Sequence, residues 1–160
     1  MSNDKLIVIV GPTASGKSAL AIELAKEFWN IFWQEPGKKF VPKPENLAKS
    51  HLGMFLKGKF SSIAFVGTEI GCGDGYVDLL VNFLGINYIV ELKILGGSWG
   101  IGWSKEGLSQ LARYMSIYET TESYLIVFDG RKTSKGEQLH NEYNLDNKIV
   151  HVISAKIYWE

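Results

Sequence analysis

Apolar and polar side chains alternate along two neighbouring runs of the chain, residues 77–84 and 87–95. Alternation of this kind is typical of β-strands that bury one face. The two runs flank Gly85-Ile86, and a glycine at the first central position suits a two-residue type II′ turn. The pattern therefore predicts a β-hairpin.

One face of this hairpin is predicted to carry charge. With the turn at Gly85-Ile86, the strand register pairs Asp78 with Lys93 and Leu80 with Glu91. The three charged side chains then lie on one side. The other side is apolar and is expected to be buried; it consists of Val77, Leu79, Val81, Phe83, Tyr88, Val90, Leu92 and Ile94.

The charged face is a candidate metal site. Asp78 and Glu91 repel each other at close range unless a cation lies between them, and a hard divalent ion with oxygen ligands suits that position. Lys93 beside the ion could orient a water or stabilise charge on a phosphorane. The alternative is a solvated sheet face with a salt bridge.

The rest of the pattern predicts two helices and three more strands. One helix begins near Pro44, because proline suits a first turn, and ends at Gly58. The other begins with Ser104 as its N-cap and continues to about residue 118. The segments between and beyond them are a strand at 62–70, a flexible loop with two tryptophans at 96–103, a strand at 123–128, a polar excursion at 130–147 and a strand at 148–155.

The arrangement Asp78…Glu91-Leu92-Lys93 resembles the D…(D/E)xK signature of the PD-(D/E)xK nuclease superfamily. The resemblance implies an α/β fold, with an αβββαβ restriction-endonuclease-like core and a mixed sheet. It also implies hydrolysis of DNA, or alternatively RNA, with Mg²⁺ or Mn²⁺. Asp78 and Glu91 would be metal ligands, and Lys93 would assist the attacking water.

Two further segments resemble parts of the same superfamily. PENLAKSHLGMFL is similar to the first core helix of nuclease-like domains at the C-terminal ends of certain ATPases, which makes Glu45 a candidate metal ligand. Stabilisation of the helix N-terminus is the alternative role of Glu45. Gln110 and Tyr114 form a Gln-x-x-x-Tyr pattern like that of the RecB-like branch, where these residues support the site and contact DNA.

A different motif lies near the N-terminus. Gly11, Gly16, Lys17 and Ser18 form GxxxxGKS between a predicted strand and a predicted helix, the setting of a phosphate-binding P-loop. It predicts ATP or GTP binding as an alternative function. Asp129 has the form of the acid that such a site needs at a strand end, but a turn residue before Gly130 is the preferred interpretation.

The segment GPTASGKSALAIELA resembles the N-terminus of the tRNA dimethylallyltransferase family. The resemblance ends at Phe28, and the general base and long remainder of that family have no counterpart, so transferase activity is not expected. We therefore predict a P-loop-like strand and helix at 1–28, a connector at 29–43 and a nuclease-like domain at 44–160. The first segment would be joined to the rest by recombination or by deliberate fusion, giving a chimeric chain.

Charge and cysteine content limit the partners and the compartment. The 160 residues carry a formal net charge of +0, so any DNA-binding surface must be local, and a homodimer or a larger ATPase partner would help to hold DNA. Arg131, Lys132 and Lys135 are available for phosphates. A single cysteine excludes an intramolecular disulfide, no apolar run is long enough to span a bilayer, and a cytoplasmic protein without a membrane partner is expected.

Overall fold

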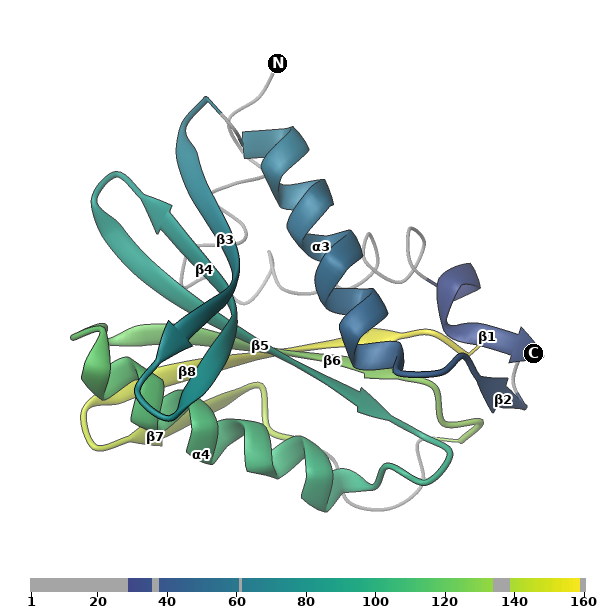
Figure 1. Cartoon of the computed structure of the whole chain (residues 1–160). Coiled ribbons are helices and arrows are strands. Elements are labelled where there is room, and N and C mark those ends of the chain that lie inside the picture. Colours follow the sequence, from purple (N-terminus) through teal and green to yellow (C-terminus); the bar gives the residue numbers. More distant parts are fainter. Residues whose placement is uncertain (1–28, 36–37, 61, 134–138, 159–160) are drawn as a thin grey trace.

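A mixed six-stranded sheet with one helix on each face forms the centre of the protein (Figure 1). The computed structural model describes residues 29–35, 38–60, 62–133 and 139–158. The helices and strands are η1 (Trp29–Phe32), β1 (Trp33–Glu35), β2 (Lys39–Phe40), α3 (Pro44–Phe60), β3 (Ala64–Cys72), β4 (Gly75–Phe83), β5 (Ile86–Leu95), α4 (Ile101–Ile117), β6 (Glu122–Asp129), β7 (Glu142–Leu145) and β8 (Lys148–Lys156).

The strands lie in the order β3-β4-β5-β6-β8-β7. Neighbours β3, β4 and β5 are antiparallel, whereas β5, β6 and β8 are parallel, and β7 is antiparallel to β8. From α3 to β6 the chain runs helix, three strands, helix, strand, which confirms the α/β class and the mixed sheet. The predicted polar excursion at 130–147 is wrong in part, because it contains β7.

Each face of the sheet packs against one helix. Leu52 and Leu56 of α3 belong to the same buried cluster as Val90 and Leu92 of β5. On the opposite face, Leu111 of α4 packs with residues of β5, β6 and β8. The apolar layer predicted for the hairpin therefore lies under α3, with the exception of Val77, which belongs to the α4 side.

The hairpin turn differs from the predicted one. It lies at Leu84-Gly85, with φ angles of 52° and 83°, and Phe83 pairs with Ile86. Positive φ at both central residues is the pattern of a type I′ turn rather than type II′. The register is shifted by two residues, so the side chains of the paired stretch keep their predicted faces. The predicted pairing of Asp78 with Lys93 is wrong, because the ladder ends at Leu79 and Val90.

Phe32, Trp33 and Phe40, in the predicted connector at 29–43, pack against the sheet. Phe32 is fully buried and its ring centroid lies 4.9 Å from that of Phe128. The Trp33 indole N–H donates to the Ile157 carbonyl at 3.0 Å, and the Trp33 ring stacks on Phe40. Their aromatic side chains thus dock on the unit that begins at α3. The boundary at 44 stays a prediction, and segment 1–28 lies outside the described residues.

Helix α4 begins earlier than expected. Its N-cap is Gly100, so Ser104 lies inside the first turn and is buried. Trp103 is consequently a helix residue, not part of a flexible loop. Helix α3 also extends past Gly58 to Phe60. Across the described ranges, no helix is both long enough and apolar enough to cross a membrane.

Candidate active site

The candidate site lies where β4 separates from β5. The ladder between these strands ends at Leu79 paired with Val90, after which β4 pairs only with β3 and β5 only with β6 (Figure 1). Main-chain N–H groups of β5 that face the vacated side need other acceptors. Carboxylates provide them: Asp78 Oδ2 accepts from Leu92 N at 2.9 Å.

Glu45 is the second carboxylate at this edge. Its Oε1 atom accepts from the main-chain N–H of Ile94 at 3.3 Å, two residues along β5 from Leu92. The same oxygen accepts from the Trp103 indole N–H at 2.7 Å. Glu45 lies in the first turn of α3 and Trp103 in the first turn of α4, so this carboxylate joins both helices to the strand.

Glu91 and Lys93 form a buried pair on the α4 side of β5. Lys93 Nζ lies 2.9 Å from Glu91 Oε1, and the residues are 5% and 3% exposed. The Lys93 ammonium also lies 5.2 Å from the centroid of the Trp103 ring. Gly107 of α4 lies against this pair, and a Cβ atom there would lie 3.3 Å from Lys93 Cε and 2.9 Å from Leu125 Cδ1.

The environment of Glu91 disfavours its charged form. Burial, and then the charge of Asp78, raise the pKa of Glu91 from 4.5 to about 7, although Lys93 acts in the opposite direction. Burial alone would lower the pKa of Lys93, but the Glu91 charge and hydrogen bond raise it. Glu91 Oε2 is buried and has no hydrogen-bond partner among the described residues. An oxygen in that state is a suitable ligand for a cation.

Lys49 occupies the other side of Asp78. Its Nζ atom lies 3.1 Å from Asp78 Oδ1 and 3.1 Å from a carboxylate oxygen of Glu69. Glu69 is in β3 and has a φ angle of 52° where the β3–β4 pairing is interrupted. Lys49 was not identified from the sequence, although its place one helical turn after Glu45 puts both on one face of α3.

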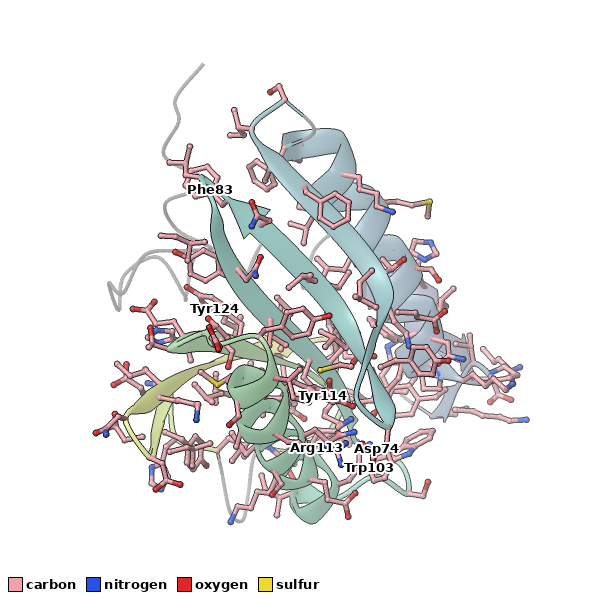
Figure 2. The ribbon with its side chains drawn as sticks, turned by 60° about the vertical axis from the view of Figure 1, so that its left-hand side comes forward. Asp74, Phe83, Trp103, Arg113, Tyr114 and Tyr124 are labelled. Atoms are coloured by element: carbon pink, nitrogen blue, oxygen red, sulfur yellow. The ribbon has the colours of Figure 1, made fainter. Side chains whose placement is uncertain are left out.

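Tyr114 lies beneath the turn that leads into β4. It is 2% exposed, and a Cβ atom on Gly75 would lie 2.6 Å from its hydroxyl oxygen. Figure 2 shows Arg113 beside this turn, where its guanidinium lies 3.4 Å from Asp74. Tyr114 therefore supports the strand that carries Asp78. Gln110 lies half-buried one turn earlier on α4.

The donor set suits a hard cation, but the carboxylates are not gathered around one point. Within the described part of the chain, no group of three or more His, Cys, Asp or Glu side chains has the spacing of a metal site. Asp78 and Glu45 are bonded to β5, and Lys49 stands at Asp78. A divalent ion shared by Asp78 and Glu91 would replace Lys49 as the charge partner of Asp78.

The predicted phosphate-binding loop cannot be placed, because Gly11, Gly16, Lys17 and Ser18 lie outside the described residues. Asp129 ends β6, as predicted, and is 6% exposed. Its carboxylate accepts from the main-chain N–H and the guanidinium of Arg131. These contacts agree with a turn residue at the strand end.

Comparison of the chain with protein-family models, with curated proteins and with solved structures found no match in any of the three.

Proposed function

We propose that the chain is a Mg²⁺-dependent nuclease of the PD-(D/E)xK type, built on a restriction-endonuclease-like core and acting on DNA. The element order from α3 to β6 supports this proposal. The observation that carries it is that Asp78 and Glu45 both bond to β5 beside the Glu91–Lys93 pair, at the point where β4 leaves β5. The reaction would be hydrolysis of a phosphodiester by water.

Each side chain has a role in this scheme. Asp78 and Glu91, with Glu45, would hold Mg²⁺ or Mn²⁺, which when bound supplies Lewis-acid stabilisation of a phosphate oxygen. Lys93 keeps its ammonium beside Glu91, where it would orient the attacking water and stabilise negative charge. Gln110 and Tyr114 would support the site and contact DNA from α4.

Two other functions remain as alternatives. Lys49 already neutralises Asp78, an arrangement that would also suit a nuclease fold retained as a non-catalytic binding module. The motif at residues 11–18 supports ATP or GTP binding by sequence alone. For the nuclease, a homodimer or an ATPase partner in the cytoplasm would supply the additional DNA contacts that a chain with no net charge lacks.

The test is cleavage of plasmid and single-stranded DNA with Mg²⁺, Mn²⁺ or a chelator. Glu91→Gln keeps the shape of the side chain and removes the ligand charge, so a loss of at least about a hundredfold is expected. Glu106→Gln, on the exposed side of α4, is the matched control. Equal activity of wild type and Glu91→Gln would remove the nuclease assignment.

A further inference from the structure

A cavity of about 370 Å³ lies at the ends of the parallel strands, beyond the candidate site. Leu95 of β5 and Asp129 of β6 pair with each other at its edge, and Lys156 of β8 pairs with Asp129. These residues lie at the carboxyl ends of their strands, where open α/β sheets usually bind ligands. Leu95 is two residues after Lys93, so the cavity adjoins the proposed catalytic groups.

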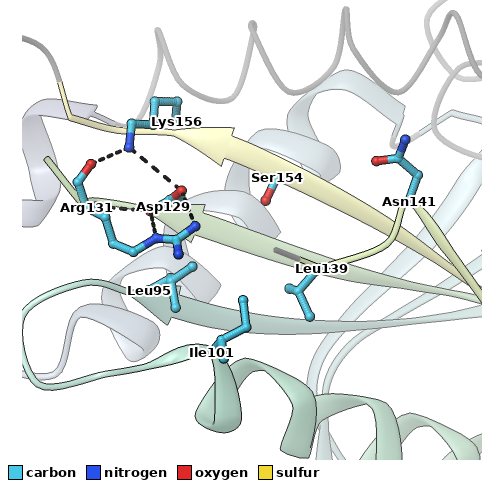
Figure 3. Close-up of a pocket in the computed structure, with 8 residues that line it drawn as sticks. All are labelled: Leu95, Ile101, Asp129, Arg131, Leu139, Asn141, Ser154 and Lys156. Atoms are coloured by element: carbon cyan, nitrogen blue, oxygen red, sulfur yellow. Dashed lines mark hydrogen bonds and ion pairs between the residues drawn. The ribbon is translucent and has the colours of Figure 1, made fainter. Parts of the chain in front are cut away.

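Among the described residues that line the cavity, the charged ones are Asp129, Arg131 and Lys156, one carboxylate and two cations. Asp129 is bound by Arg131 Nε at 2.9 Å and lies 3.7 Å from Lys156 Nζ. Lys156 also donates to the Arg131 carbonyl (Figure 3). One carboxylate thus faces two cations, which are held at a fixed place on the wall. An anion can share both of them.

A helix end adds to this positive field. Ile101, the first residue of α4, lines the cavity. Gly100 provides no side-chain cap, and the first turn of α4 has no acidic residue of its own, so the carboxylate at this helix end is Glu45, bonded to Trp103. The N-terminus of α4, the Arg131 guanidinium and the Lys156 ammonium therefore all favour a negatively charged ligand.

The remaining wall is apolar in part. Ile101 and Leu139 line it away from Asp129, Arg131 and Lys156, and Leu95 lies beside Arg131 (Figure 3). Ser154 adds a hydroxyl, and Asn141 offers an amide with both donor and acceptor atoms. A ligand that matches both walls has a phosphate at one end and a flat, weakly polar group at the other. The cavity volume is within the usual range for small-molecule sites.

We infer that this cavity binds a nucleotide, with its phosphate at Arg131 and Lys156 and its base against Ile101 and Leu139. The choice of a nucleotide as the phosphate carrier rests on the proposed nuclease function. The phosphate could belong to the end of a DNA strand or to a free mononucleotide. In either case the ligand lies at the end of β5, the strand that carries Glu91 and Lys93.

The inference is tested by calorimetric titration of the full chain, without metal, with three ligands. These are thymidine monophosphate, thymidine and inorganic phosphate. Lys156→Gln removes an ammonium from a side chain that is 37% exposed, so the fold should tolerate it. It should weaken thymidine monophosphate binding about tenfold, the loss expected for one charge-assisted phosphate contact. Lys57→Gln, exposed and outside the cavity, should bind like wild type.

One further variant and one activity assay separate this site from the others. Lys17→Ala should leave binding unchanged if the cavity, and not the glycine-rich motif, holds the nucleotide. Wild-type protein that binds thymidine monophosphate but cleaves no DNA would reject the proposed function and leave the cavity assignment standing. Binding of oligonucleotides with and without a terminal phosphate then shows whether the bound phosphate belongs to the end of a DNA strand or to a free mononucleotide.

Four results would overturn the inference. The first three are no binding at millimolar thymidine monophosphate, equal binding by wild type and Lys156→Gln, and a loss in Lys17→Ala without a loss in Lys156→Gln. Binding of thymidine as tight as that of its monophosphate would overturn it as well, because the phosphate would then contribute nothing.

Discussion

Lys49 Nζ lies 3.1 Å from Asp78 Oδ1, and the two side chains are 15% and 17% exposed. The ammonium therefore compensates a carboxylate that the proposed function assigns to a metal ion. A metal ion that binds at Asp78 therefore competes with the Lys49 ammonium.

Lys49→Gln should increase the affinity for Mg²⁺. Removing the competing charge at a partly exposed pair is worth about 1 kcal/mol, or about a fivefold decrease in Kd. Calorimetric titration of Mg²⁺ gives the measurement, with Lys57→Gln in the exposed last turn of α3 as the control. An unchanged or weaker affinity would show that Lys49 does not compete with the ion.

The pKa of Glu91 predicts how stability varies with pH in the absence of metal. Burial raises this pKa from 4.5 to about 7, so the native state binds a proton more tightly than the unfolded chain between these values. Stability is then lost as pH rises through that window, by on the order of 3 kcal/mol at about 1.4 kcal/mol per pKa unit.

Glu91→Gln should lack this loss. Urea unfolding at pH 5, 6, 7 and 8 with a chelator should give a flatter profile for Glu91→Gln than for wild type, and Glu106→Gln should follow wild type. Parallel profiles for wild type and Glu91→Gln would mean that the Glu91 carboxyl titrates alike in the folded and unfolded chain.

Gly75 and Tyr114 are predicted to be coupled. A Cβ atom at Gly75 would lie 2.6 Å from the Tyr114 hydroxyl oxygen, so Gly75→Ala should cost about 1–3 kcal/mol. Gly71→Ala is the matched control, since no atom lies within 4 Å of its added Cβ. In chemical unfolding, Gly75→Ala combined with Tyr114→Phe should recover most of the loss, and strict additivity of the two changes would contradict the contact.

The hairpin turn offers a stabilising substitution. Leu84 has a φ angle of 52° and is 79% exposed, so its side chain contributes strain and little packing. Leu84→Asn creates an Asn-Gly pair suited to a type I′ turn and should add about 0.5–1 kcal/mol to the free energy of unfolding. Thermal unfolding would show this as a higher Tm, whereas a lower Tm would argue against the turn geometry.

The sequence predicted the faces of the hairpin better than its register. Side chains repeat with period two, so the shift of two residues left Glu91 and Lys93 on their predicted face, whereas Val77, beyond the end of the ladder, lies on the other one. The turn itself was missed because Leu84 gives no local signal for a positive φ angle. A two-residue error in register is therefore invisible in the alternation pattern.

Contacts between residues far apart in the chain were the other feature that the sequence pattern could not predict. The hydrogen bonds of Asp78 and Glu45 to β5 depend on where β4 leaves the sheet, which no local pattern specifies. The part played by Trp103 depends on α4 starting three residues before Ser104, without a side-chain cap to mark it. Strand β7 is short and polar, so its pairing with β8 could be seen only in three dimensions.

The central claim is that Asp78 and Glu91 share a divalent cation. Crystals soaked in Mn²⁺ and measured at the manganese absorption edge test it directly. The account predicts an anomalous peak within about 2.5 Å of carboxylate oxygens of both residues, with Lys49 moved away from Asp78. A fully occupied Mn²⁺ site elsewhere, with the Lys49–Asp78 pair intact, would contradict it.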